Sequence, residues 1–242
     1  MAYSNLLHFI KEGNLIVFFD LEATQFTHKA IALGFVAYEK KIGEVSFDLE
    51  KKMEYHAYIK QEDEIGPVVE ELTGIHQETL QKEGKDFHQV VLEVSKMLRP
   101  YKKKFLSYGS MDIRILNESI DKQDETERNF YRNVIKNYLD FHMYISKRIC
   151  DKRGQSYSIS SLLKLYGLEI DGPYHNPLMD SLALSKIYYA YVNDEKKDIE
   201  LYLQNYAQNR NTNAINKKLA LRVLEQNQVS KDDLIMLLRD NL

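Results

Sequence analysis

The chain has 242 residues, 44% hydrophobic and 29% charged, with only ten glycines and four prolines, which excludes a disordered or fibrous protein. Its net charge of −3 argues against a protein that coats nucleic acid by bulk electrostatics, so any nucleic-acid contact must be local. Its only cysteine, Cys150, excludes an intramolecular disulfide, and we expect neither a signal peptide nor a membrane-spanning segment. We therefore expect a soluble, cytoplasmic protein with one substantial core.

The first strong element is an apolar run over residues 15–19 that ends in Asp20 and Glu22. A continuous run rich in β-branched and aromatic residues predicts a strand buried on both faces. Because side chains alternate along a strand, Asp20 and Glu22 point the same way. Two neighbouring carboxylates in a partly dry place favour a bound cation such as Mg²⁺ or Mn²⁺. A core strand that exits into a solvated acidic turn explains this stretch equally well.

The flanking segments predict an antiparallel meander followed by helices. Residues 1–13 are consistent with one helical turn, residues 30–38 with a second strand, and residues 44–60 with one or two more strands. Pro67 suits the first turn of a short helix that ends at Thr73-Gly74. Apolar residues at helical spacing predict an amphipathic helix over residues 86–98.

The middle of the chain again shows an apolar run that is followed by an acid. Residues 105–108 predict a short strand, and Asp112 then lies near the start of a helix. Residues 121–132 are highly charged, and we expect them to be solvated. Residues 138–141 suit a last strand and residues 143–149 a helix behind it, but the periodicity of this segment does not decide between the two types of element.

Another pair of helices completes the predicted domain. One covers residues 158–165, and the other begins at Pro177 after a loop that carries His175. Asp180 then falls about one turn into the second helix, where it is the fourth acid of interest.

We place a domain boundary near residue 193, because the predicted sheet is complete by that point. Residues 194–242 show apolar positions that predict two or three short helices, the last capped by Ser230. These apolar positions must be covered by the main domain, by a protein partner or by self-association.

Taken singly, Asp112 is better explained as a residue of a solvated helix face, and His175 as a structural loop histidine. The set of four acids is harder to dismiss. Through residues 20–24, 108–112 and 175–180 the chain resembles the DEDDh 3′-to-5′ exonuclease family. The resemblance covers roughly residues 12–192 and includes the Leu-Thr-Gly-Ile segment at residues 72–75.

The resemblance implies an α/β fold of the ribonuclease H-like type, with a mixed five-stranded sheet flanked by helices and a small C-terminal helical appendage. The domains would be an exonuclease domain at 1–193 and a helical unit at 194–242. The sequence Asp-Leu-Glu-Ala-Thr at residues 20–24 is similar to that of the subgroup with histone-mRNA and sporulation-inhibitor exonucleases. Gln25 departs from the Gly or Cys usual at that position, and Asn176 excludes the related family that carries Tyr there.

The resemblance also implies site roles. His175 would be the general base, and two divalent cations, Mg²⁺ or Mn²⁺, would be held by Asp20, Glu22, Asp112 and Asp180. The residues expected to contact substrate are Leu21, Ala23, Thr24, Phe26 and Tyr108, with Tyr174 as a further candidate for base stacking.

The implied function is removal of nucleoside 5′-monophosphates from the 3′ end of single-stranded RNA or DNA. Three alternatives stay open: an editing subunit that serves a polymerase, a nucleic-acid-end binding module without turnover, and a phosphoesterase acting on small nucleotides. The complete acid set argues against the binding module. Turnover of a labelled oligonucleotide would separate these classes.

Overall fold

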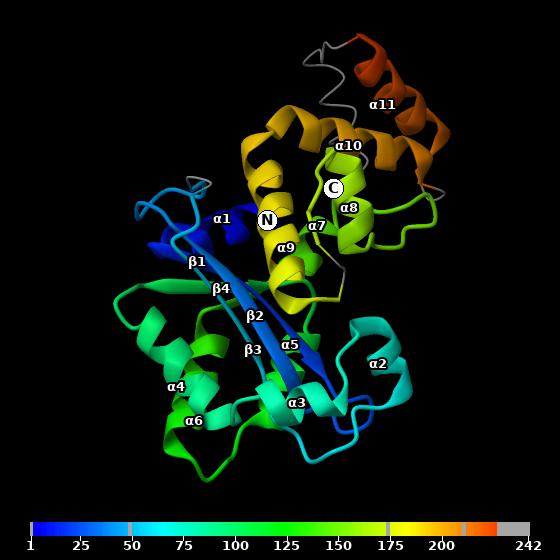
Figure 1. Ribbon diagram of the computed structural model, residues 1–242. Coiled ribbons are helices and arrows are strands. Elements are labelled where there is room, and N and C mark those ends of the chain that lie inside the picture. Colours follow the sequence, from blue (N-terminus) through cyan, green and yellow to red (C-terminus); the bar gives the residue numbers. More distant parts are fainter. Residues whose placement is uncertain (1, 48–49, 173–174, 210–211, 227–242) are drawn as a thin grey trace.

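The centre of the molecule is one five-stranded sheet, seen in a computed structural model that describes residues 2–47, 50–172, 175–209 and 212–226. The strand order is β3-β2-β1-β4-β5. The strands are β1 (Leu15–Ala23), β2 (Ala30–Glu39), β3 (Met53–Tyr58), β4 (Lys103–Ser107) and β5 (Tyr138–Asp140). The acid-bearing strand β1 therefore lies in the middle of the sheet (Figure 1).

The first three strands form the predicted antiparallel meander. Asp20 of β1 pairs with Gly34 of β2, and Gly34 pairs with His56 of β3. Strands β4 and β5 run parallel to β1, so the predicted mixed five-stranded sheet is confirmed. Of the one or two strands expected over residues 44–60, the described part of that segment forms one.

Helices cover both faces of the sheet (Figure 1). On one face, apolar side chains of β1 and β2 pack against α4 (Phe87–Leu98), α5 (Met111–Ser119) and α6 (Glu125–Lys136). On the other face they pack against α1 (Ala2–Lys11), α7 (Phe141–Ile145), α8 (Ile159–Tyr166) and α9 (Pro177–Asn193). Because β1 supplies side chains to both cores, the prediction of a strand buried on both faces is confirmed.

A third, smaller cluster joins α2 (Pro67–Thr73) and α3 (Gln77–Glu83) to the start of β2. As predicted, Pro67 occupies the first turn of α2, and Gly74 ends it with a φ of 67°. This left-handed backbone conformation favours glycine.

Two expectations from the sequence differ from the structure. Residues 121–132 were expected to be solvated, but α6 begins within them, Glu127 is buried and Phe130 packs against the core. The single turn expected near the N-terminus is instead a ten-residue helix, whose Leu6 and Ile10 are fully buried. In the N-terminal segment, Leu6 and Ile10 are buried at helical spacing, and in residues 121–132 Phe130 is partly buried although its neighbours are mostly charged or polar.

The ambiguous segment 134–149 contains both predicted elements. Strand β5 is short, and α7 follows it directly, ending at Ile145 rather than Ile149. Asp140 begins α7 because its Oδ1 accepts the N–H of Met143 at 3.3 Å.

The C-terminal segment forms α10 (Glu195–Gln208) and α11 (Ala214–Gln226), which pack on each other. Leu201 of α10 also belongs to the core under α9. The third predicted helix and its cap Ser230 lie outside the described residues, and the boundary near residue 193 stays a prediction. None of the helices that the structure describes is long and apolar enough to cross a bilayer.

Candidate active site

Asp20 and Glu22 lie at the carboxyl end of β1, on the face covered by α9. Gly34 makes this approach possible, because a Cβ at Gly34 would lie 2.2 Å from the backbone nitrogen of Leu178 and 2.3 Å from the carbonyl carbon of Pro177. Glycine inside a strand is expected where another backbone comes this close. The first turn of α9 therefore rests directly on the strand position that pairs with Asp20.

Asn176 starts α9 at a defined residue. Its Oδ1 accepts the N–H groups of Leu178 and Met179 at 3.1 and 3.3 Å, and Pro177 follows in the first helical position. The hydroxyl of Ser181 donates to the carbonyl of Gly34 at 3.0 Å. These contacts hold Asp180 in the first turn of α9, close to the acids of β1.

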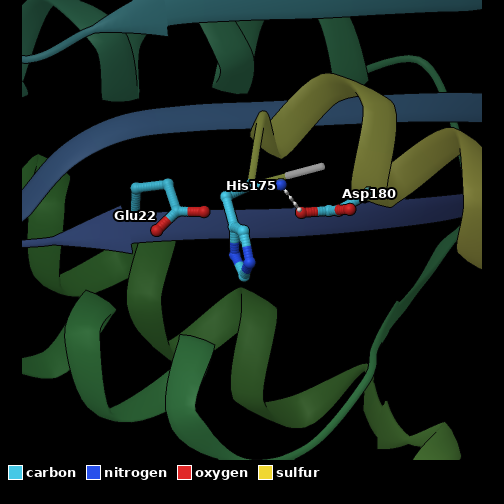
Figure 2. Close-up of side chains that lie close together, drawn as sticks. All are labelled: Glu22, His175 and Asp180. Carbon is cyan, nitrogen blue, oxygen red and sulfur yellow. Dashed lines mark hydrogen bonds between the residues drawn. The ribbon is translucent and has the colours of Figure 1, made fainter. Parts of the chain in front are cut away.

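His175 lies just before this cap, with a φ of 60°, a conformation that is uncommon for a residue other than glycine. Its backbone N–H donates to Oδ2 of Asp180 at 3.1 Å, and its side chain is exposed. Figure 2 shows the imidazole between the carboxylates of Glu22 and Asp180. One ligating atom from each of the three residues lies within 4.8 Å of the others.

Asp112 reaches the site from the other face of the sheet. It lies in the first turn of α5, is only 5% exposed, and accepts the backbone N–H of Leu21 at 3.0 Å. This hydrogen bond joins residues 91 positions apart and fixes Asp112 beside the end of β1.

The turn before Asp112 is held by groups from β4 and β5. The Tyr138 hydroxyl donates to the carbonyl of Gly109 at 2.6 Å and lies 3.0 Å from the Ser107 hydroxyl. Asp140 accepts the N–H of Gly109 at 3.1 Å. These residues and Gly34 were not predicted as part of the site. A glycine within an apolar strand was a readable signal for Gly34, whereas no sequence pattern marks Tyr138.

The four acids share a low-dielectric, negatively charged environment. Burial, followed by the charges of the other three acids, raises the pKa of Asp20 well above its usual value. Burial, followed by the charges of Asp180 and Asp112, raises the pKa of Glu22 to about 8, while burial raises the pKa of Asp112 to about 6. Burial also raises the pKa of Asp180, against the opposing effect of His175.

The crowded carboxylates are suited to bind divalent cations. Each carboxylate offers oxygen donors of the type that Mg²⁺ and Mn²⁺ prefer. Like charges that raise each other's pKa values are stabilised when cations bind between them. The donor set therefore fits divalent cations.

The residues expected to contact substrate differ in exposure. Phe26 is 68% exposed, whereas the side chains of Leu21 and Thr24 are buried, and Ala23 is half-buried. The Tyr108 side chain is half-buried, and its hydroxyl donates to the carbonyl of Tyr157. Tyr174 lies outside the described residues. Phe26 is thus the most accessible aromatic side chain among these candidates.

An exonuclease family model, RNase_T, matches residues 17–188, which is most of the chain. The chain belongs to this exonuclease family. This membership confirms the resemblance to the DEDDh exonucleases that the three motifs carry. The protein is a nuclease, a hydrolase acting on nucleic acids. Members of the family use divalent metal ions, and the acids gathered here fit such a site. No curated protein sequence matches the chain.

Solved structures share the fold of this exonuclease. The nuclease domain of 3′hExo, a DEDDh family member bound to rAMP, has a TM-score of 0.60 and 21% identity over 76% of this chain and 94% of that one. Cell-death related nuclease 4 has a TM-score of 0.58 and 17% identity over 76% and 65% of the two chains. E. coli Exonuclease I in complex with a dT13 oligonucleotide has a TM-score of 0.53 and 14% identity over 76% and 42%.

These likenesses confirm the predicted ribonuclease H-like fold. The chain spans 61% of a full-length 3′-exonuclease and 65% of the 3′-exonuclease that recognises the histone mRNA stem-loop. Identities this low show the fold and not the substrate.

Proposed function

We propose that this exonuclease removes nucleoside 5′-monophosphates one at a time from the 3′ end of single-stranded RNA or DNA. The observation that carries the proposal is the convergence of four acids from β1, α5 and α9 at the carboxyl end of β1, with His175 beside them. This arrangement also argues against a binding module without turnover, because binding an end does not need four crowded carboxylates.

The charges of Asp112, Glu22 and Asp180 all act on Asp20, so Asp20 would help to hold both of two cations. Glu22 and Asp180 would complete one cation site, and Asp112 would contribute to the other. Mg²⁺ or Mn²⁺ bound there would supply the charge that stabilises the negative oxygens of the phosphodiester during hydrolysis.

His175 is suited to take the proton of the attacking water. Its imidazole is exposed and adjacent to Glu22 and Asp180, so it faces the place where the scissile phosphate would lie. The hydrogen bond from its N–H to Asp180 holds the backbone from which the imidazole extends. A general base held within reach of its proton contributes roughly 10²–10⁴-fold to the rate.

Phe26 and Tyr108 are the candidates for stacking on the terminal bases. Leu21, Ala23 and Thr24 belong to the same segment as Asp20, Glu22 and Phe26, and they are kept as candidates for substrate contact. Stacking is tolerant of sequence, which agrees with a substrate defined by its free end rather than by its bases. The solved relatives include one bound to rAMP and one in complex with dT13, and both RNA and DNA are retained as substrates for this chain.

The helical unit at 194–242 is proposed as a region for a protein partner or for self-association. Ile199 of α10 and Leu221 of α11 are exposed. An editing role beside a polymerase would use this region. The cytoplasmic location expected from the sequence is likewise kept as a proposal.

The test is hydrolysis of a single-stranded oligonucleotide labelled at its 5′ end, as RNA and as DNA, with Mg²⁺, with Mn²⁺ and with a chelator. A ladder that shortens from the 3′ end only when a cation is present supports the proposal. Asp20→Asn should abolish the ladder, whereas Asp86→Asn, an exposed acid before α4, should not. Cleavage from the 5′ end, or binding without any cleavage, would contradict the proposal.

A further inference from the structure

A second group of metal-ligating side chains lies away from the catalytic acids, where α4 meets α6. His88 is in the first turn of α4, Asp124 caps α6, and Glu127 is in the first turn of α6. These helices cover the sheet face opposite α9 (Figure 1). One ligating atom from each residue lies within 4.8 Å of the other two.

The spacing of the donor atoms matches a shared cation. Nδ1 of His88 lies 3.0 Å from Oδ2 of Asp124 and 3.4 Å from Oε1 of Glu127. Zinc-like ions bind nitrogen and oxygen at about 2.0–2.2 Å, so neighbouring ligands in tetrahedral or octahedral geometry lie roughly 3.0–3.5 Å apart. Both distances from the imidazole nitrogen are in this range.

Backbone N–H groups orient both carboxylates. Oδ1 of Asp124 accepts the N–H of Glu127 at 2.9 Å, and Oε2 of Glu127 accepts the N–H of Asp121 at 2.6 Å. Each carboxylate therefore has one oxygen held by the backbone and the other directed at His88. Such hydrogen bonds are the usual means by which proteins fix metal ligands in place.

Glu127 is a buried carboxylate that faces the other two ligands. Its side chain is only 6% exposed, and its Oε1 lies 3.4 Å from Nδ1 of His88. A buried carboxylate is costly unless hydrogen bonds or a nearby positive charge compensate it. A cation held jointly by His88, Asp124 and Glu127 would supply such a charge.

We propose that His88, Asp124 and Glu127 form a second cation site, separate from the catalytic one, that binds a transition-metal ion of the Zn²⁺ class. An imidazole donor favours such ions over Mg²⁺, which prefers oxygen ligands alone. The bound ion joins the start of α4 to the start of α6 and has a structural role. This inference does not rest on the proposed exonuclease direction or substrate.

The experiment uses the full chain, stripped of metal, with Asp20→Asn and Asp180→Asn introduced together to weaken the catalytic site. Zn²⁺ binding is counted by equilibrium dialysis, Co²⁺ is titrated by its visible absorption, and Tm is measured with and without Zn²⁺. We expect this background to bind one equivalent of Zn²⁺ and to gain Tm with it. Adding His88→Ala should weaken binding at least tenfold and remove the gain in Tm.

His76→Ala is the matched control, because His76 is exposed and its Nδ1 lies 3.9 Å from a single carboxylate, that of Glu70. It should leave Zn²⁺ binding unchanged. Glu127→Gln preserves the shape of the side chain and should also weaken binding, which guards against a folding defect in His88→Ala. If the background binds no Zn²⁺, or if His88→Ala and Glu127→Gln bind it as the background does, the trio is an ion pair only and the proposal is wrong.

Discussion

Gly34→Ala is the sharpest test of how α9 is held against the acids of β1. The added Cβ would lie 2.2–2.6 Å from backbone atoms of Pro177 and Leu178, whereas ordinary contact begins at 3.4 Å. The start of α9 must therefore move away by about 1 Å, since backbone atoms cannot rotate aside as a side chain can. Overpacking of this kind costs about 1–3 kcal/mol of unfolding free energy.

The same displacement carries Asp180 and His175 away from Asp20 and Glu22. A misplacement of about 1 Å in a catalytic group can lower the rate about 10²-fold. We therefore expect Gly34→Ala to fold with reduced stability and to lose most of its kcat. Stability is measured by urea denaturation, and kcat by hydrolysis of a labelled single strand at saturating substrate and Mg²⁺.

Gly13→Ala is the matched control, because its Cβ would also be crowded, at 2.8 Å from the Lys102 carbonyl oxygen and from Cγ of Lys104. Gly13 precedes β1, at the end of the strand away from the acids. It should lose stability but keep kcat per folded molecule. If Gly34→Ala keeps the kcat of the wild type, or if both variants lose activity equally, α9 does not position the site as argued.

Four further outcomes are expected. Asp20→Asn should abolish cation-dependent turnover and raise the Tm of the metal-free protein, because it replaces a carboxyl group whose ionisation is disfavoured by burial and by the neighbouring acids; full activity would contradict the metal assignment. Burial and neighbouring carboxylates raise the pKa of Glu22 to about 8, so the folded metal-free protein holds this proton more tightly than the unfolded chain does. The stability that the Glu22 proton contributes should be full below about pH 4.5 and be lost as pH rises through about 8. Mg²⁺ should therefore raise Tm more at the higher pH, and an increase in Tm that does not depend on pH would refute this. His175→Ala should lower kcat roughly 10²–10⁴-fold, whereas His28→Ala, the other histidine at positive φ, should leave kcat unchanged. Removal of 194–242 should lower Tm, because α10 shares the main core, yet leave hydrolysis of a short single strand intact; a folded truncation without activity would count against this.

Much of the fold could be predicted from local patterns. The apolar runs predicted β1 and β2, and Pro67, Pro177 and Gly74 predicted where helices begin or end, because these signals act within a few residues. The prediction that residues 121–132 are solvated missed the burial of Glu127 against α4, because the charged composition of this segment gave no sign of it. A contact between two helices cannot be read from the composition of one of them.

The candidate acids were predicted from the motifs, but their support was not. Asp112 is fixed by the N–H of Leu21, and the turn before it by Tyr138 and Asp140, all of which come from other elements of the sheet. The roles of these residues depend on pairing between segments far apart in the chain, for which local periodicity carries no signal.

By itself the sequence determined that Asp20 and Glu22 share one face of a buried strand, because alternation along a strand is a local property of the backbone. It also determined the order and type of the other site residues. Only the tertiary structure decided that Gly34 lets α9 touch the sheet, and that burial with like charges raises the pKa values of the acids. Close approach and desolvation depend on which distant segments meet, and that is settled by packing of the whole chain.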